Sequence, residues 1–184
     1  YEKRGVAVQV PEWNADTCIQ CNQCAFVCPH ATIRPFALTE AEMAAAPAQT
    51  KHIPVKGKVG ADMQYVLAVS PLDCMGCGLC AIQCPTDSLT MMPIADELNE
   101  QPVFDYCVKD VARKEELEGT SVKASQFKRP LLEFSGSCAG CAQTSYARLV
   151  TQLFGDRMYI ANATGCSSFC SGPATTAIYT VNAD

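Results

Sequence analysis

Short apolar runs separated by polar and turn-forming residues mark out the first hundred positions. Val6–Val10 alternates apolar with small or polar side chains, which predicts a half-buried strand. Tyr65–Val69 is a continuous apolar run, which predicts a second strand. Between them, Thr39–Glu42 has the capping-box pattern, so we expect a short alanine-rich helix that ends before Pro47. Residues 51–60 are rich in proline and glycine and predict a loop.

The pattern changes after residue 108. Residues 109–128 are crowded with charged side chains, which is typical of a linker or a solvated segment. Leu131–Phe134 then predicts a strand. Residues 144–154 carry apolar side chains at helical spacing, and Gly155 stands where a helix commonly ends. Met158–Ala161 predicts a buried strand, so the order strand–helix–strand favours a parallel α/β layer.

The first hundred residues also contain an internal repeat. Four cysteines with the spacing Cys-x2-Cys-x2-Cys-x3-Cys-Pro recur 56 positions later, and the residues that follow each Cys-Pro are similar. The two sets are Cys18, Cys21, Cys24 and Cys28, and Cys74, Cys77, Cys80 and Cys84. A duplicated half-domain is the simplest cause, with each half covering one face of a shared core.

This cysteine spacing predicts two 4Fe-4S clusters with crossed ligands. Three cysteines at i, i+3 and i+6 wrap the backbone around one cube, and in the bacterial ferredoxin run the fourth cysteine serves the other cube. We therefore assign Cys18, Cys21, Cys24 and Cys84 to one cluster, and Cys28, Cys74, Cys77 and Cys80 to the other. The alternative is zinc, which binds four thiolates but would leave half of these thiols without a role.

Three further cysteines suggest a third site. Cys138 and Cys141 form a Cys-x2-Cys pair, and Cys166 follows 25 residues later. They are either three ligands of another cluster, or a redox-active pair, or ordinary buried thiols. Cys107 and Cys170 have no partner at ligand spacing, so we interpret them as inert apolar residues.

Composition and charge narrow the class of protein. Thirteen cysteines in 184 residues are fewer than in a short disulfide scaffold, and no signal peptide or membrane-spanning run is visible. We therefore expect a reducing compartment, namely the cytoplasm or, in a eukaryote, the matrix of a mitochondrion-related organelle. A net charge of −5 without a basic stripe argues against nucleic-acid binding.

Taken with these motifs, the chain resembles single-chain pyruvate:ferredoxin oxidoreductases, members of the 2-oxoacid:acceptor oxidoreductase family, nearly from end to end. The stretches that carry the resemblance are Glu2–Val8, Val10–Asn14, Cys18–Cys24, Val27–His30, Ser125–Lys128, Leu131–Gly136, Thr151–Arg157 and Ile160–Ser168. Members of this family decarboxylate pyruvate on thiamine diphosphate with Mg²⁺, form acetyl-CoA and CO2, and pass electrons singly through three 4Fe-4S clusters.

The resemblance implies an α+β fold in three parts. Residues 1–106 would form a two-cluster ferredoxin-like domain, 107–129 a linker, and 130–184 the opening of an α/β thiamine-diphosphate domain. Cys138, Cys141 and Cys166 would hold the cluster nearest the thiamine, with the fourth ligand further along the sequence. Gln143 and Cys166 would touch the thiamine, and Gly165 would let the backbone approach that cofactor.

Two departures from the family pattern affect the site. Gln143 stands where the family usually has glutamate, and Phe169-Cys170-Ser171 replaces Ile-Trp-Gly. The sequence also lacks a magnesium–diphosphate motif and the glutamate that activates thiamine. We therefore expect the rest of the enzyme on flanking sequence or other chains, in a homo-oligomer that passes electrons to ferredoxin, flavodoxin or a flavin domain. The competing interpretations are a non-catalytic electron carrier and a zinc-stabilised interaction module.

Overall fold

Each cysteine repeat folds as a strand, a short helix and a second strand in the computed structural model, which describes residues 4–161 and 165–167. The first repeat contains β1 (Gln9–Trp13), α1 (Gln23–Val27) and β2 (Ile33–Leu38). The second contains β4 (Gln64–Val69), α3 (Leu79–Ile82) and β5 (Leu89–Pro93). Corresponding elements lie 55 to 56 residues apart, so the structure supports a duplicated half-domain.

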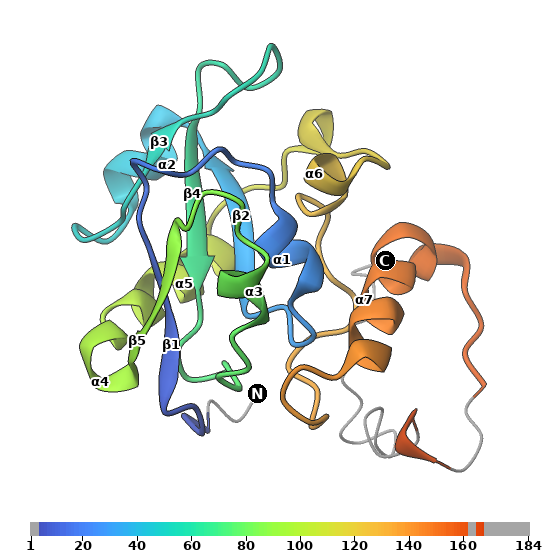
Figure 1. Ribbon diagram of the computed structural model, residues 1–184. Coiled ribbons are helices and arrows are strands. Elements are labelled where there is room, and N and C mark those ends of the chain that lie inside the picture. Colours follow the sequence, from blue (N-terminus) through green and yellow to red (C-terminus); the bar gives the residue numbers. More distant parts are fainter. Residues whose placement is uncertain (1–3, 162–164, 168–184) are drawn as a thin grey trace.

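The two repeats exchange strands. β1 pairs antiparallel with β5, so that Trp13 lies opposite Leu89, and β2 pairs antiparallel with β4, so that Ile33 lies opposite Val69. Each pair therefore takes one strand from each repeat. Helices α1 and α3 lie next to each other at the centre of the molecule (Figure 1).

The spacer between the repeats adds a helix and a third strand. Helix α2 (Glu40–Ala45) begins at Thr39 with a complete capping box, as the sequence predicts. The predicted loop contains one short strand, β3 (Ile53–Pro54), which extends the second sheet in the order β2-β4-β3.

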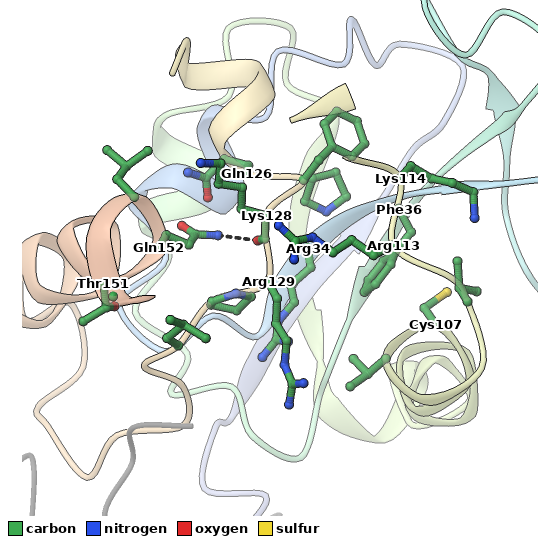
Figure 2. A pocket seen from close by; sticks show the side chains of 18 of the residues that line it. Arg34, Phe36, Cys107, Arg113, Lys114, Gln126, Lys128, Arg129, Thr151 and Gln152 are labelled. Carbon is green, nitrogen blue, oxygen red and sulfur yellow. Dashed lines mark hydrogen bonds between the residues drawn. The ribbon is translucent and has the colours of Figure 1, made fainter. Parts of the chain in front are cut away.

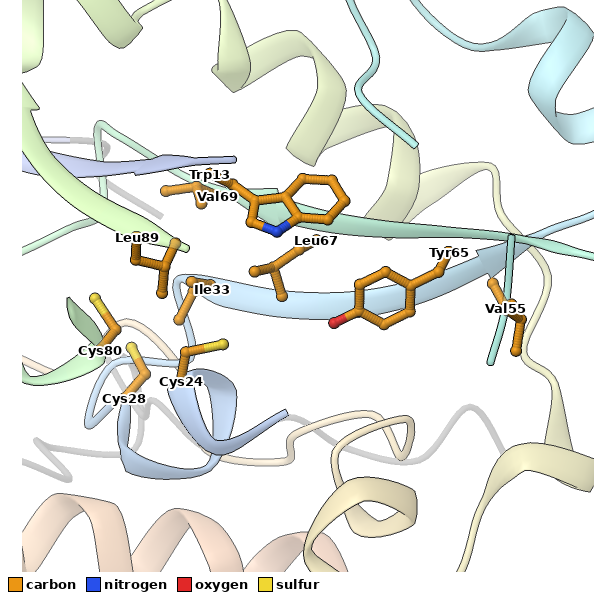
Figure 3. Packing of buried hydrophobic residues seen from close by; sticks show 11 residues of the cluster. Trp13, Cys24, Cys28, Ile33, Val55, Tyr65, Leu67, Val69, Cys80 and Leu89 are labelled. Atoms are coloured by element: carbon orange, nitrogen blue, oxygen red, sulfur yellow. The ribbon is translucent and has the colours of Figure 1, made fainter. Parts of the chain in front are cut away.

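Strand β4 is buried on both faces, which explains its continuous apolar run. Val66 and Ala68 pack against Val103, Phe104 and Cys107 of α5 (Glu100–Lys109), which follows the short helix α4 (Ile94–Glu97). The alternate side chains Tyr65, Leu67 and Val69 lie on the side of the cysteines, together with Trp13 and Ile33 (Figure 3). The cysteine sites are therefore built directly onto the apolar core.

The predicted first strand begins three residues later than expected. The pairing of β1 with β5 starts only at Gln9, so Val6 and Val8 precede the strand. These two side chains are 53% and 83% exposed. The polar segment after α5 also differs from a solvated linker. It contains η1 (Glu115–Leu117) and α6 (Val122–Ser125), and both Leu117 and Phe127 pack against the apolar core.

The last part of the described chain is dominated by helix α7 (Ala142–Phe154), which confirms the predicted helix and is followed by η2 (Gly155–Arg157). The prediction of a strand on each side of this helix was wrong. Leu131–Phe134 contains only an isolated bridge residue, and Met158–Ala161 is extended chain outside any sheet, with Tyr159 fully exposed. All the strand pairs of the described residues are antiparallel, so these residues do not form the expected parallel layer.

Gly155 ends α7 for a reason other than the expected one. Its φ of −59° is right-handed, so the position does not require glycine for its conformation. A Cβ atom there would lie 2.5 Å from Leu131 Cδ1, so a larger residue at this position requires the Leu131 side chain to shift. None of the described helices is both long enough and apolar enough to cross a membrane.

Candidate iron–sulfur sites

The backbone of the two cysteine motifs follows the same path, including its rare conformations. Gln20 and Asn22 have φ values of 59° and 60°, and their counterparts Gly76 and Gly78 have 68° and 73°. After each Cys-Pro, Ala31 and Asp87 are also left-handed, with φ values of 54° and 49°. Left-handed residues turn the chain sharply, so each motif curls its first three cysteines around one centre.

In the first motif, side-chain hydrogen bonds offset the cost of this conformation. Gln20 donates from Nε2 to the Pro54 carbonyl and accepts from the Lys56 N–H, each at 2.7 Å. Asn22 donates to the Lys123 carbonyl and accepts from the Tyr65 hydroxyl, each at 2.8 Å. Both side chains are 1% exposed, so they tie the spacer and α6 to the cysteine loop.

Sequence reasoning missed Gln20 and Asn22, although a signal was present. Aligning the repeats places them opposite Gly76 and Gly78, and glycine at an equivalent position indicates a left-handed backbone. Asparagine tolerates that conformation, but glutamine there needs the support that Pro54 and Lys56 provide.

Four thiols from both repeats surround one centre, which we call the inner site. Cys28 of the first motif lines the same cavity as three cysteines of the second, together with Ile33 and Leu79. The four thiols are Cys28, Cys74, Cys77 and Cys80. All except Cys77 are buried (Figure 3 shows Cys28 and Cys80). This group takes one cysteine from the first repeat and three from the second, and its role as a ligand set stays a prediction.

The complementary group, which we call the outer site, contains Cys18, Cys21, Cys24 and Cys84. Burial raises the pKa of Cys24, and the nearby thiols of Cys18, Cys21 and Cys84 raise it further. Cys84 is thus close to the first motif. Only Cys24 of this group is buried, so the outer site is the more exposed of the two.

The surroundings of the thiols fit iron–sulfur clusters, which need thiolates that accept backbone hydrogen bonds. The amides of Gln20 and Gly76, at equivalent positions, point to Cys18 and Cys74 Sγ at 3.4 Å, and the Ser88 amide points to Cys84 Sγ at 3.2 Å. Burial raises the pKa of Cys74 to about 11, so cluster binding must displace a proton there. For Cys84, burial is outweighed by hydrogen bonds from Thr86 and Ser88, which lower its pKa.

Across residues 4–161 and 165–167, no three histidine, cysteine or acidic side chains are grouped closely enough to share one ion. Zinc would draw four sulfurs to 2.3 Å from one ion.

Cys138 and Cys141 lie on a turn directly before α7. The Cys141 N–H donates to the Cys138 carbonyl at 3.1 Å, and Gly140 between them has a φ of 72°. Cys141 is the N-cap residue of α7 and has no side-chain capping hydrogen bond, but the nearby Thr144 hydroxyl and the Thr144 and Gln143 amides lower the pKa of its thiol. The pair is therefore suited to a thiolate ligand at a helix N-terminus.

The remaining predicted residues are less closely associated. Cys166 is exposed, and the described structure shows no contact that joins it to Cys138 or Cys141. Gly165 before it has a φ of 153°, and Gln143 is exposed on the first turn of α7. Cys107 is fully buried, and burial raises its pKa to about 12, as expected for an inert thiol. Cys170 lies outside the described residues.

A second cavity, of about 650 Å³, contacts none of the predicted cluster ligands. It lies between β2, α5 and the end of α7, and basic side chains are prominent in its lining (Figure 2). Several of these are paired, Arg34 with Glu133 and Lys114 with Glu42. Its chemistry is distinct from that of the cysteine sites.

Comparison with known proteins agrees with this geometry. Residues 17–88, which include all eight cysteines of the repeat, match the model of the 4Fe-4S dicluster domain. This part of the chain is therefore a 4Fe-4S dicluster domain.

The relatives extend the match to the whole chain. It is 50% identical to a pyruvate:ferredoxin oxidoreductase of Moorella thermoacetica and 52% identical to a pyruvate-flavodoxin oxidoreductase of Enterobacter agglomerans, each over 99% of this chain. It is 49% identical to a pyruvate dehydrogenase (NADP+) of Cryptosporidium parvum. The chain is homologous to one segment of the pyruvate:ferredoxin and pyruvate-flavodoxin oxidoreductase family, and spans about 16% of the length of the first two relatives.

Proposed function

We propose that this chain is the electron-transfer segment of a pyruvate:ferredoxin or pyruvate-flavodoxin oxidoreductase. The complete enzyme would oxidise pyruvate with CoA to acetyl-CoA and CO2. The observation that carries the proposal is the crossed grouping of eight cysteines inside a sequence that is about 50% identical to such enzymes over its whole length.

In this proposal the inner and outer sites each hold one 4Fe-4S cluster, which supplies one-electron acceptor and donor chemistry when bound. The chain's own residues shape and shield the sites. The left-handed residues of each loop direct its cysteines, and the apolar side chains of Ile33 and Leu79 limit water at the inner site. The amides of Gln20, Gly76 and Ser88 stabilise the added negative charge on sulfur.

The positions of the cysteine groups support an order of transfer. A Cβ atom on Gly140 would lie 3.6 Å from the Cys77 Cβ, so the Cys138–Cys141 turn lies against the inner site. The outer site has the more exposed thiols. We therefore order the sites from the Cys138–Cys141 turn to the inner site and then to the outer site, where an external acceptor would dock.

The assignment of Cys138, Cys141 and Cys166 to a third cluster, and of Gln143, Gly165 and Cys166 to thiamine diphosphate, belongs to this proposal. The lowered pKa of Cys141 supports its role as a ligand. Residues 1–106, 107–129 and 130–184 would be the dicluster domain, a connecting segment and the opening of the thiamine domain. The rest of the enzyme would complete the Mg²⁺–thiamine site, and ferredoxin, flavodoxin or a fused flavin domain would accept the electrons.

The proposal is tested on the complete enzyme purified without oxygen. We expect about twelve irons and as many acid-labile sulfides per polypeptide from three cubes, together with viologen reduction that requires both pyruvate and CoA. Zinc without sulfide would overturn the proposal. Clusters without pyruvate-dependent reduction would instead favour the non-catalytic carrier.

The crossed ligands have a test of their own. Replacing Cys84 by serine should perturb the outer cluster, although Cys84 belongs to the second motif. Low-temperature EPR of the reduced enzyme identifies the altered signal, and Cys28→Ser is the matched control that should alter the inner cluster. If each substitution perturbs the cluster of its own motif instead, the ligands are not crossed.

A further inference from the structure

The guanidinium of Arg148 is buried in the core of the interface between α7 and α1. Its side chain is among the largest that are less than 2% exposed. Nη2 donates to the carbonyls of Ala25 and Phe26, at 2.8 and 2.5 Å, near the C-terminal end of α1. Nη1 donates to the side-chain carbonyls of Gln126 and Gln152, at 3.1 and 2.9 Å. Figure 2 shows these two glutamines, which come from α7 and from the segment after α6.

All four of these acceptors are neutral. No aspartate or glutamate in the described part of the chain forms an ion pair with Arg148, and its Nε has no hydrogen-bond partner there. A buried cation without a counter-charge is strongly disfavoured, because the protein interior solvates charge poorly. The other buried arginine, Arg34, is by contrast paired with Glu133. Arg148 therefore calls for a negative charge that the described carboxylates do not supply.

The inner site is a source of such a charge. Ala25 and Phe26 lie in α1 and Cys28 directly follows that helix, so Arg148 holds the helix end that carries Cys28. The Ser145 hydroxyl, on the same helix as Arg148, donates to the Val27 carbonyl directly before Cys28. Burial and the Arg34 cation lower the pKa of Arg148 to about 10, and the Cys28 thiolate opposes this shift.

We propose that Arg148 is the counter-charge of the inner cluster and raises its reduction potential relative to that of the outer cluster. This inference rests on the proposed function, because it requires a cluster held by Cys28, Cys74, Cys77 and Cys80. Reduction adds one electron to the cluster and forms or breaks no bond. A fixed positive charge beside Cys28 stabilises the added negative charge and so favours the reduced form.

Arg148 also connects two sites. It lies on the helix that begins at Cys141, so the same helix presents one cysteine pair and delivers a cation to the inner site. We interpret Arg148 as a positioning and tuning residue, since its hydrogen bonds hold α7 against α1 and its charge acts on the cluster.

The test compares three substitutions in the complete enzyme by anaerobic redox titration followed by EPR. Arg148→Gln removes the charge but keeps an amide that can donate to the α1 carbonyls. Gln126→Glu leaves Arg148 in place and neutralises it with an adjacent carboxylate, while the Ser125 hydroxyl can turn to donate to that carboxylate. Arg148→Lys keeps the charge.

We expect Arg148→Gln and Gln126→Glu to lower the equilibrium constant for reduction of the inner cluster by about tenfold. For one electron this lowers its reduction potential by about 59 mV. The reduction potential of the outer cluster should change much less. Arg148→Lys should leave both close to the wild-type values. Arg113→Gln is the matched control, since it removes one exposed cation that is paired with Glu118 outside the cysteine sites.

The outcomes separate the two proposals. Absence of clusters from the wild-type enzyme would remove the proposed function and this inference together. If Gln126→Glu keeps all its clusters and the reduction potential of the inner cluster is unchanged, only the role of Arg148 is overturned. The same holds if the potentials of both clusters shift equally. If Arg148→Gln loses its clusters, Gln126→Glu compared with Arg148→Lys decides the question, because both retain a cation at position 148.

Discussion

The two-motif unit, residues 9–109, and the region from residue 130 to 161 are held in place by different forces. The first has apolar clusters on both faces of β4, with fully buried side chains such as Leu38 and Cys107. The second has one long helix whose buried side chains are polar, namely Thr144, Arg148, Thr151 and Gln152. Its apolar residues Tyr146, Val150 and Phe154 are 71%, 43% and 50% exposed.

This difference explains what each region requires. The two-motif unit contains its own core and needs the cofactors to bring its buried thiols together. The α7 region is attached by directional hydrogen bonds to α1 and leaves an apolar face uncovered. Homology to enzymes about six times longer is consistent with a region that continues into further structure.

The largest expected effect comes from removing an inner ligand. Unlike Cys28→Ser, which keeps an oxygen that can bind iron, Cys28→Ala leaves no ligand and should cost about eight irons per polypeptide. Cys28 belongs to the first repeat but serves a site with the second, so both halves lose their order. Cys138→Ala should cost only about four and leave the two-motif unit folded. Iron and sulfide analysis with circular dichroism distinguishes the two. Equal losses in both variants would mean that the regions are not separable.

Truncating the two apolar surfaces should give effects of different size. Leu67 lies in the core and is 3% exposed, so Leu67→Ala should lower the free energy of unfolding by about 2–5 kcal/mol. Phe154→Ala should cost less than about 0.5 kcal/mol in the 184-residue chain. Denaturant unfolding of the chain and of the complete enzyme checks both values. A much larger cost for Phe154→Ala in the complete enzyme would show that another part covers α7.

A smaller effect should reveal the strain in the first motif. Asn22→Gly keeps the left-handed backbone but loses two hydrogen bonds, whereas Asn22→Ala loses both the bonds and the conformation. We expect the alanine variant to be less stable than the glycine variant by about 1–2 kcal/mol. Gly78→Asn is the control at the equivalent position, where an added Cβ meets no atom within 4 Å. Equal stability of the two Asn22 variants would contradict the role assigned to the backbone.

The smallest effect concerns the spacer. Burial raises the pKa of Glu42, but hydrogen bonds from Lys114, Thr39 and Ala112 outweigh it and lower the pKa to about 2. Because the pKa of Glu42 is lower in the folded state, its carboxylate stabilises the fold above the ordinary pKa of 4.5. This stabilisation is lost as the pH falls from 4.5 toward 2. Glu42→Gln should therefore cost roughly 1 kcal/mol at pH 7. Anaerobic unfolding of both proteins at pH 7, 5 and 4 should show a difference in unfolding free energy between wild type and Glu42→Gln that narrows only below about pH 4.5. A difference that stays constant with pH would mean that the cost comes from packing.

The sequence predicted the repeat well and the C-terminal region poorly, for physical reasons. The cysteine spacing, the buried run at 65–69 and the capping box at Thr39 are local signals, and each corresponds to an element of the structure. The start of β1 depends on its partner β5, which a local pattern cannot contain. The apolar spacing in residues 144–154 correctly predicted a helix but not which face is buried, because Arg148 and its glutamine partners come together only in the folded chain.

The exchange of strands and ligands between the repeats has a consequence for biosynthesis. The inner site cannot be completed until Cys80 has left the ribosome, and the outer site cannot be completed until Cys84 has. Strand β1 likewise cannot pair until β5 follows it. At ordinary translation speeds the 56 residues from the start of the first motif to the start of the second take roughly 3–11 s to synthesise. During that interval the nascent chain presents four thiols that lack their partners, Cys18, Cys21, Cys24 and Cys28. The length of the spacer therefore sets how long the thiols of the first motif wait for their partners in the second motif.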